Sequence, residues 1–329
     1  MNYLFCSVGR RGELIKFFKN TLSDESKVIA TDNSPYAPAL YMADKQYIVP
    51  RIDDPDYLKC LFEICKKENI QAVTTFIDPE IEILAKNRKA FADIGVAVLG
   101  PSEYTAKLCF DKYLMFCYLR EKGIPTTMTW GSLEEFDEAY KTGKVQFPVF
   151  VKPRTGSGSV GAHKVESYEE LQVSVQMDPS LIIQELMDGG DLDADVYIDM
   201  ISHGAVSAFL KRKLETRIGG ASKTVSFKDP TLFELIRQVT GVLEFFGPVD
   251  MDFFVRNGKY YLSEINPRFG GAYLHAYGSG VDFVKLIENN LRGIENDPCF
   301  GDYEEGSVMM MYDSVVIKRA CEISEGNPV

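Results

Sequence analysis

Short apolar runs alternate with amphipathic stretches along the first 100 residues of the chain. The apolar runs, each of strand length, lie at 2–8, 27–32, 72–77 and 96–100. Between them, stretches such as 10–22 and 55–70 repeat apolar residues at helical spacing. Strand–helix–strand repetition predicts parallel strands with crossover helices, and therefore a doubly wound α/β domain. Ligands of such sheets bind beyond the carboxyl ends of the strands, which we expect at 6–12, 32–34 and 78–80.

Beyond residue 100 the pattern changes to longer helices and alternating strands. We predict helices at 105–123 and 231–247, and strands at 147–154, 181–187 and 193–202. The last two strands are expected to run antiparallel across a short turn. The segment 249–265 predicts a second hairpin, because two alternating strands flank Asn257-Gly258, the strongest short hairpin signal.

Composition then restricts the class of protein. The chain has 329 residues, enough for about two domains, and a net charge of -12. An acidic balance argues against a general nucleic-acid binder, which normally carries a basic surface. Seven cysteines without a CxxC pair and three histidines without close spacing argue against a disulfide framework and against zinc or histidine metal sites. Apolar runs fall short of the roughly 20 residues of a membrane span, and the N-terminus lacks the charge order of a signal peptide, so we expect a cytoplasmic protein without a membrane partner.

The predicted hairpin carries the most informative polar residues. Alternation places Asp250 and Asp252 on one face of its first strand, and Glu264 and Asn266 on one face of its second. Facing carboxylates repel unless a cation lies between them, and a hard oxygen site of this kind suits Mg²⁺. An acidic pair alone is more typical of a solvated polar face. An amide ligand and a phosphate-binding guanidinium, Arg268, beside the same pair favour the metal site.

Two further segments favour a nucleotide. Lys152 interrupts an apolar strand, and the glycine-rich segment 155–162 follows, whose backbone amides could approach phosphate oxygens closely. The alternative for Lys152 is an edge-strand lysine that points outward. Glu185 ends another apolar strand, and a short turn leads to Asp191, a carboxylate that could accept hydrogen bonds from ribose hydroxyls. The alternative is a hairpin with exposed acids.

A basic segment and the loops of the first domain add weaker candidates. The segment 211–226 concentrates basic residues in an acidic chain, and it is either a solvated strand pair or an anion site for ATP or an acceptor carboxylate. We select Arg212 and Arg217 from it, with Lys211 next. His275 is either part of an acceptor pocket or a hydrogen-bonded structural residue. Six residues at the strand ends of the first domain could complete a substrate pocket: Ser7, Gly9, Arg10, Arg11, Asp78 and Glu80.

Taken in order, these motifs resemble one superfamily. Four segments are similar to the motifs of ATP-grasp enzymes: FDKYLM with Lys112, FPVFVKP with TGSGSVG, IIQELMDGGDLDADV, and VDMDFFVRNGKYYLSEINPRFGG. They most resemble the carbamoyl-phosphate synthetase large chain and biotin carboxylase branch of that superfamily. The segment ADKQYIVP resembles the preATP-grasp domain of that branch. The resemblance implies a doubly wound preATP-grasp domain followed by an ATP-grasp fold, in which two α+β subdomains clamp ATP. The implied divisions are 1–100 for the first domain, 101–180 for the small subdomain with its linker helix, and 181–329 for the C-terminal subdomain.

The resemblance also implies roles for individual residues. ATP would be bound by residues of four segments: Lys112, Lys152, Gly156, Ser157, Gly158, Ser159, Glu185, Leu186, Met187, Asp191 and Arg212. Mg²⁺, for which Mn²⁺ could substitute, would be held by Asp252, Glu264 and Asn266. The transferring phosphoryl group would be stabilised by Arg268, Lys152 and Arg217. Relatives more often have Glu or Gln at the position of Asp252, so the shorter side chain changes the metal geometry.

The implied reaction is an ATP-dependent ligation. A carboxylate does not react with an amine at neutral pH, and phosphorylation supplies a leaving group, so we expect an acyl phosphate that an amine attacks, with release of ADP and phosphate. One alternative is a carbamoyl-phosphate-synthetase-like phosphorylation of bicarbonate or carbamate. Another is a nucleotide-binding protein without turnover. The expected partners are a small-molecule carboxylate and an amine, with a homodimer by family analogy.

Overall fold

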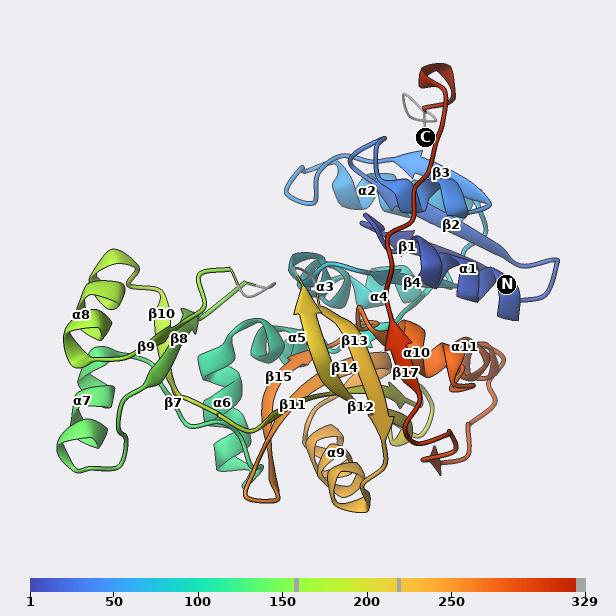
Figure 1. Cartoon of the computed structure of the whole chain (residues 1–329). Helices are drawn as coiled ribbons and strands as arrows, with labels where there is room; N and C mark the ends of the chain where they lie inside the picture. The colour runs from blue at the N-terminus through green and yellow to red at the C-terminus, as the bar shows by residue number, and fades with distance from the viewer. Residues whose placement is uncertain (157–159, 218–219, 324–329) are drawn as a thin grey trace.

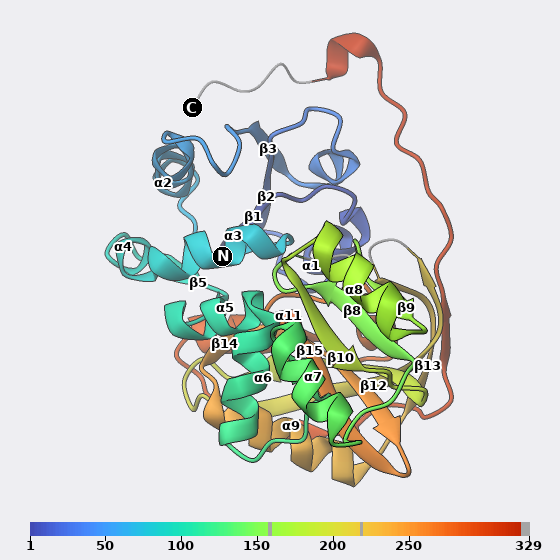
Figure 2. The ribbon, with the colours of Figure 1, turned by 90° about the vertical axis from the view of Figure 1, so that its left-hand side faces the viewer.

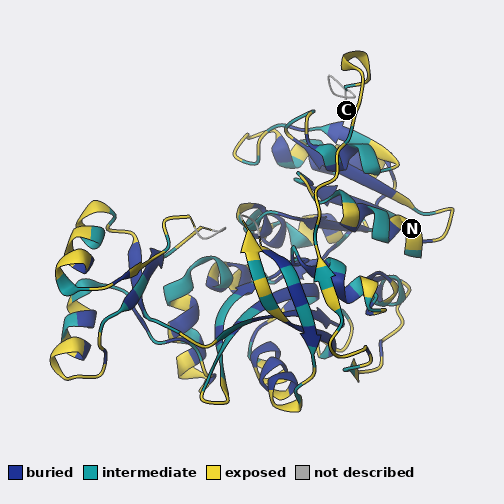
Figure 3. Cartoon of the chain, viewed as in Figure 1, coloured by how far each residue is buried: buried dark blue, intermediate teal, exposed yellow. Residues whose placement is uncertain are grey.

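The computed structural model describes residues 1–156, 160–217 and 220–323, and these build three sheets that lie apart from one another (Figure 1). The first domain contains a five-stranded sheet. A four-stranded sheet, the small sheet, is formed near the middle of the chain, and an eight-stranded sheet, the large sheet, is formed mainly by the residues that follow it. Residues that Figure 3 colours as buried run along the middle of each sheet, and exposed residues lie on the outer helices. Within the described residues, none of the helices combines the length and the apolar character that a bilayer span requires.

The first domain is a doubly wound parallel sheet, as predicted. Its strands are β1 (Asn2–Cys6), β2 (Lys27–Asp32), β3 (Lys45–Ile48), β4 (Ala72–Thr75) and β5 (Ala97–Val98), in the order β3-β2-β1-β4-β5. Its helices are α1 (Gly12–Thr21), η1 (Pro38–Met42), α2 (Tyr57–Lys67), α3 (Asp78–Lys86) and α4 (Arg88–Ala92). Alternate residues of β1 enter two different apolar clusters, Tyr3 with Phe18 of α1 and Leu4 with Leu61 of α2. Helices therefore cover both faces of the sheet.

The single helix predicted at 105–123 is wrong, because the chain forms two helices there. These are α5 (Glu103–Phe110) and α6 (Lys112–Glu121), and Asp111 lies between them. The Asp111 side chain accepts hydrogen bonds from the backbone N–H groups of Tyr113 and Leu114, and its carboxylate also binds Arg154 Nε at 2.8 Å. Aspartate at an N-cap stabilises a helix start in this way. As a result Lys112 occupies the first residue of α6.

The small sheet has the order β7-β10-β8-β9, with antiparallel neighbours. Its strands are β7 (Thr129–Trp130), β8 (Val149–Pro153), β9 (His163–Val165) and β10 (Leu181–Glu185), and α7 (Leu133–Lys141) and α8 (Tyr168–Met177) cover its outer face (Figure 1). Because β10 pairs with β8 and β7, the hairpin expected between 181–187 and 193–202 is wrong. The boundary that we expected between the two ATP-grasp subdomains, after residue 180, falls immediately before β10, which belongs to the small sheet. Val149 and Val151 point into the core under the helices, so alternation turns Lys152 to the opposite face.

The large sheet has a central path β15-β14-β11-β12-β13-β17. Its strands are β11 (Gly190–Ile198), β12 (Ala205–Arg217), β13 (Gly220–Phe227), β14 (Phe245–Arg256), β15 (Lys259–Asn266) and β17 (Val308–Met310), with β6 (Gly100–Pro101) and β16 (Cys299–Phe300) at its margins. Helix α9 (Pro230–Val242) contributes Leu232 and Ile236 to the same apolar cluster as Leu192 and Val196 of β11. The helix predicted at 231–247 is wrong at its end, because the chain enters β14 at Phe245.

Helix α1 joins the first domain to the end of the large sheet. Helices α10 (Tyr273–Gly278) and α11 (Phe283–Leu291) follow β15. The ring of Phe18 on α1 meets the ring of Phe269 edge-on at 5.6 Å, and Phe17 stacks on Tyr277 at 4.0 Å. The first domain therefore packs directly beside the carboxyl end of β15. Residues 311–323, which follow β17, pass along the outside of the molecule to the first domain (Figure 2) and are mostly exposed.

A buried carboxylate, Asp199, ties the end of β11 to α11. It accepts hydrogen bonds from Asn290 Nδ2 at 2.6 Å, from the Asn296 backbone N–H at 3.0 Å, and from the N–H groups of Ile201 and Ser202 at 2.9 Å. Burial disfavours the charged form, but the hydrogen bonds from Asn290 and the backbone outweigh it and lower the pKa of Asp199 to about 2.

We therefore predict that Asp199→Asn destabilises the fold. A pKa that is lower in the folded state gives stability that is present above the unfolded pKa and is lost as pH falls through the folded pKa. At pH 7 the substitution should lower the free energy of unfolding by about 2 kcal/mol, and the difference from the wild type should shrink between about pH 4 and pH 2. Urea unfolding at several pH values measures this. Asp24→Asn, at an exposed residue, is the control, and an equal loss in both variants would contradict the role of the network.

Candidate functional site

The hairpin of β14 and β15 brings the predicted metal ligands together. Asn257 and Gly258 have φ of 52° and 72°, the left-handed conformations that a two-residue hairpin turn requires. The resulting register pairs Asp252 with Glu264 and Asp250 with Asn266. A bulge between Asp252 and Phe253 interrupts the regular pairing next to the carboxylate pair. The pair of side chains and the adjacent amide offer hard oxygen ligands of the kind that Mg²⁺ prefers.

Arg268 connects this hairpin to the first domain. Its Nε donates a hydrogen bond to Asp78 Oδ1 at 2.7 Å, and its Nη2 lies 3.5 Å from Asn266 Oδ1. Another guanidinium nitrogen lies 4.0 Å from Asp250 Oδ2. Burial disfavours the charged guanidinium, but Asp78 and the other acids outweigh it and raise the pKa of Arg268. Arg268 is thus a fixed positive charge next to the proposed metal ligands.

Two lysines from other elements approach the same carboxylates. Lys112 Nζ lies 3.7 Å from Glu264 Oε1 and donates to the carbonyl oxygen of Gly156 at 2.6 Å. Lys152 is 8% exposed and has no hydrogen bond or ion pair with any described residue. Burial lowers the pKa of Lys152, while the Glu264 carboxylate acts in the opposite direction. A buried ammonium without a partner is costly, and an anion at this place would remove that cost.

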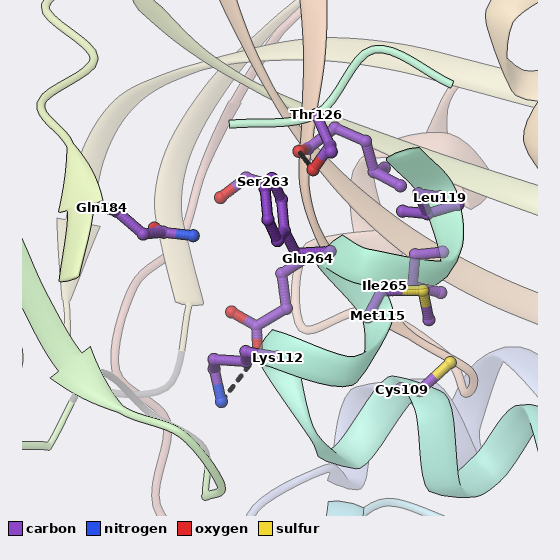
Figure 4. A pocket seen from close by; sticks show the side chains of 11 residues that line it. Cys109, Lys112, Met115, Leu119, Thr126, Gln184, Ser263, Glu264 and Ile265 are labelled. Carbon is purple, nitrogen blue, oxygen red and sulfur yellow. Dashed lines mark hydrogen bonds and ion pairs between the residues drawn. The ribbon is translucent and has the colours of Figure 1, made fainter. Parts of the chain in front are cut away.

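A pocket between the two sheets is lined by Lys112 but not by Lys152 (Figure 4). Lys112 and Glu264 lie at one side of it, and Gln184 of β10 points in from the other. The remaining wall is largely apolar, with Cys109, Met115, Phe116, Leu119, Leu262 and Ile265, and it also contains the polar residues Thr126 and Ser263. A second cavity lies where Asp78 and α5 meet the residues Ile265 to Pro267. Apolar walls with a few convergent polar groups are typical of small-molecule sites.

The residues expected to bind adenine are already hydrogen-bonded to the protein. Glu185 Oε1 accepts from the Met128 N–H at 2.9 Å, and Glu185 Oε2 accepts from Arg256 at 2.7 Å. Arg256 also donates to the carbonyl oxygen of Leu186 at 2.5 Å. The Glu185 side chain therefore ties the small sheet to β14. Its nucleotide role, with those of Leu186 and Met187, stays a prediction.

The strand β12 contributes different basic residues from those we selected. Lys213 Nζ lies 2.5 Å from Asp252 Oδ1 and 3.0 Å from Asp191 Oδ1, on the polar face of the sheet. Arg212 is exposed, packs over the ring of Phe227 at 5.8 Å, and by alternation points to the other face. The exposed Arg217 binds Glu215 at 3.1 Å. The structure therefore does not bring Arg212 or Arg217 to the carboxylates, and Lys213 is the residue that sequence reasoning missed.

Lys213 favours the charged form of the two carboxylates that it contacts, Asp252 and Asp191. Burial raises the pKa of Asp252 to about 6, and the Lys213 ammonium opposes this rise. Burial likewise raises the pKa of Asp191, again against Lys213. The sequence signal for Lys213 was its spacing of two from Lys211, which places both lysines on one face of the strand and Arg212 on the other. Reading that signal requires knowing that β11 lies between β12 and β14, and which side chains of the three strands share one face of the sheet.

Three more acids lie on the same face, deeper than Asp252. Asp193, Asp195 and Asp250 are all buried, and they could offer ligand oxygens within 4.8 Å of one another. Lys211, fully buried, forms ion pairs with Asp193 at 3.1 Å and with Asp195. One oxygen each of Asp195 and Asp250 has no hydrogen-bond partner in the described part of the chain. Sequence reasoning ranked Lys211 below Arg212 and missed Asp193 and Asp195.

The remaining candidates fall into two groups. Of the glycine-rich segment, Gly156 is described, and its carbonyl oxygen accepts a hydrogen bond from Lys112, whereas Ser157, Gly158 and Ser159 lie outside the described residues.

His275 is buried between Thr224 Oγ1 at 2.8 Å and Ser307 Oγ at 2.9 Å. Burial, and then the Lys211 charge, lower its pKa to about 4. His275 is thus the hydrogen-bonded structural residue of our two alternatives.

Comparison with known families adds two matches. Residues 3–99 match the family described as PylC-like, N-terminal domain, and residues 109–272 match the ATP-grasp domain. The ATP-grasp resemblance read from the motifs is thereby confirmed, and so is the expected order of a first α/β domain followed by one ATP-grasp unit. The site residues, from Lys112 to Arg268, lie within the second match.

Individual relatives are distant. The chain is 24% identical to the formate-dependent phosphoribosylglycinamide formyltransferase of Haloquadratum walsbyi, over 74% of this chain, and spans only 62% of that protein. It is 25% identical to D-alanine–D-alanine ligase B of Clostridium perfringens, over 69% of this chain and 88% of the relative. The biotin carboxylase domain of Hydrogenobacter thermophilus 2-oxoglutarate carboxylase, solved with MgADP, ADP and bicarbonate, shares the fold with a TM-score of 0.72 and 17% identity, covering 93% of this chain and 73% of that one.

The unpaired Lys152 generates a prediction with two opposite effects. Lys152→Met replaces a buried ammonium by an apolar side chain of similar length, so the melting temperature of the free protein should stay equal or rise. Binding of Mg-ATP should weaken about 10- to 100-fold, as expected for the loss of one hydrogen bond to a charged group. Thermal unfolding and calorimetric titration with a nonhydrolysable ATP analogue measure the two effects.

Lys164→Met is the matched control, because Lys164 lies on β9 of the same sheet and is 48% exposed beside Glu166. It should leave nucleotide affinity unchanged. A Lys152→Met protein that melts lower and binds the nucleotide as tightly as the wild type would show that Lys152 has a structural role instead.

Proposed function

For this chain, which has one ATP-grasp domain behind a PylC-like N-terminal domain, we propose an ATP- and Mg²⁺-dependent ligase that joins a carboxylate to an amine. The observation that carries the proposal is the grouping of three basic residues around the β14–β15 hairpin. Lys112 lies 3.7 Å from Glu264, the charge of Glu264 acts on the buried Lys152, and Arg268 lies 4.0 Å from Asp250 and 3.5 Å from Asn266. Several fixed positive charges beside a pair of metal-ligating carboxylates match the needs of phosphoryl transfer, which depends on positioning and charge neutralisation. The relation to a D-alanine–D-alanine ligase supports the amine as nucleophile.

The donor set fits a divalent ion. Asp252, Glu264 and Asn266 supply two carboxylates and an amide oxygen from neighbouring positions of one hairpin. Mg²⁺ bound there would supply positive charge next to the phosphates of ATP. The MgADP bound to the structurally similar biotin carboxylase domain supports this choice of cofactor.

The protein's own residues would act at the two ends of the transferred group. The substrate carboxylate attacks the γ-phosphorus, the bond to the ADP oxygen breaks, and an acyl phosphate forms. Lys112 and Lys152 neutralise the phosphates during this step, and Arg268 holds the phosphoryl oxygens beside Asn266. The amine then attacks the carbonyl carbon, the C–N bond forms, phosphate leaves with the electron pair of the C–O bond, and the amine releases its protons.

ADP release measured with Mg-ATP across substrate panels tests the proposal. The panels are carboxylates combined with amines, amino acids alone and in pairs, and bicarbonate with ammonia. Turnover that requires a carboxylate and an amine supports the ligase. Turnover with bicarbonate and ammonia alone would replace it by a carbamoyl-phosphate-synthetase-like activity, and tight ATP binding without turnover on every panel would replace it by a binding protein.

Removal of one metal-ligand charge should abolish the activity. Glu264→Gln keeps the size of the side chain and loses its charge, so ADP release should fall at least about 100-fold, in the range seen when one transition-state electrostatic contact is removed. Arg268→Ala should have a similar effect. Circular dichroism and thermal melting check the folds, and Glu234→Gln on the outer face of α9 is the control. Activity near the wild-type level in either site variant contradicts the assignment.

A further inference from the structure

The short connection from β10 of the small sheet to β11 of the large sheet is held against the end of β14. Gly189 lies so close to this strand that a Cβ there would be 1.5 Å from the carbonyl oxygen of Val255. Arg256, the next residue of β14, holds the start of the connection. Its Nη1 donates to Glu185 Oε2 at 2.7 Å, and its Nη2 donates to the carbonyl oxygen of Leu186 at 2.5 Å. One planar guanidinium thus fixes a side chain and the adjacent backbone in one geometry.

Both oxygens of the Glu185 carboxylate are bound by the protein. Oε1 accepts a hydrogen bond from the Met128 backbone N–H at 2.9 Å, and Oε2 is the oxygen that Arg256 binds. The carbonyl oxygen of Leu186 likewise accepts from Arg256. In contrast, neither the N–H nor the carbonyl oxygen of Met187 forms a hydrogen bond with any described residue. One donor and one acceptor are therefore free for a ligand, next to a peptide that Arg256 holds.

The residues expected to meet the parts of a nucleotide follow one another along β14. Asp252 is the expected metal ligand, and Asp191, expected at the ribose, pairs with Phe254 two residues further on. Arg256 follows after two more residues, roughly 13 Å from Asp252 at the rise of a strand. An extended nucleoside triphosphate has a length of this order. Phosphates bound at Asp252 would therefore place the base near the connection that Arg256 holds.

We infer that Arg256 is a positioning residue for the base of the nucleotide. It holds the peptide after Glu185 so that the backbone N–H and carbonyl oxygen of Met187 meet the donor and acceptor edge of a purine. The Glu185 side chain acts through Arg256 and not on the base. These contacts are the same before and during phosphoryl transfer, so Arg256 contributes to nucleotide affinity and not to the rate of the chemical step. The inference rests on the proposed function, because the nucleotide is the ATP of that ligase.

Calorimetric titration of the full chain with Mg²⁺ separates base binding from phosphate binding. The probes are a nonhydrolysable ATP analogue, the corresponding GTP analogue, and inorganic tripolyphosphate, which has no base. Arg256→Met should weaken binding of the ATP analogue about 10-fold, as for the loss of one hydrogen bond, and leave binding of tripolyphosphate unchanged. The preference for the ATP analogue over the GTP analogue should fall as well, because a displaced backbone edge no longer matches adenine.

Lys259→Met is the matched control, because Lys259 is exposed and pairs with Arg256 in the register of the hairpin. It removes the same charge at the same end of the hairpin and should bind all three probes like the wild type. Arg256→Lys keeps the charge but loses the planar fork, so its affinity for the ATP analogue should be intermediate. Thermal melting checks the fold of each variant.

Steady-state ADP release gives a second readout. Arg256→Met should raise the KM for ATP about 10-fold and leave kcat within about twofold of the wild type, the pattern of a contact that is equal in the ground state and the transition state. The inference is overturned if Arg256→Met binds the ATP analogue as tightly as the wild type or loses tripolyphosphate to the same extent. An unchanged preference between the two nucleotide analogues, or an equal loss in Lys259→Met, also overturns it.

The outcome is separable from that of the proposed function. Absence of ADP release on every panel, together with Arg256-dependent binding of the ATP analogue, removes the ligase and keeps the role of Arg256. ADP release by Arg256→Met with the KM for ATP of the wild type removes the role of Arg256 and keeps the ligase.

Discussion

Asp252 and Glu264 lie opposite each other because the Asn257–Gly258 turn closes the β14–β15 hairpin in one register. Side chains of a strand alternate between two faces, so a slip of one residue would move both carboxylates and Asn266 into the apolar side under α9. That slip is prevented by the apolar residues between them, Phe253, Leu262 and Ile265, which are buried in the core. The position of the charges is therefore fixed by the burial of their apolar neighbours.

The same alternation organises the whole large sheet. Asp191, Asp193 and Asp195 of β11 alternate with Leu192 and Ala194, which are buried in the apolar cluster that includes Leu232 and Ile236 of α9. Charged residues on one face then need counter-charges on the neighbouring strand, and Lys211 and Lys213 of β12 provide them through ion pairs. A carboxylate that burial would otherwise neutralise stays available as a ligand because a lysine lies beside it.

Features of the fold and site that depend on residues close in sequence could be predicted. Features that depend on pairing between strands distant in sequence could not. The hairpin pair Asp252–Glu264 could be predicted because its two strands are joined by two residues. Lys213 could not, because its contact with Asp252 depends on the alignment of β11, β12 and β14, which are distant in sequence. For the same reason β10 was assigned to the strand that follows it, whereas it pairs with β8. The break at Asp111 could have been read from cap chemistry, since an aspartate before a helical pattern favours a new helix start.

Lys152 shows how stability and binding are connected in such a site. An apolar residue at this position would spare the protein a buried charge. The Glu264 carboxylate offsets part of the cost of burying this lysine, and a bound anion would offset more of it, so part of the affinity for that anion would come from removing this cost. Arg268 is different, because Asp78 already neutralises it in the free protein. An anion that approaches both therefore gains most at Lys152, whereas at Arg268 it competes with a carboxylate of the first domain. The Arg268–Asp78 contact is thus a charged link between the two halves of the molecule, in addition to the ring contacts of Phe17 and Phe18.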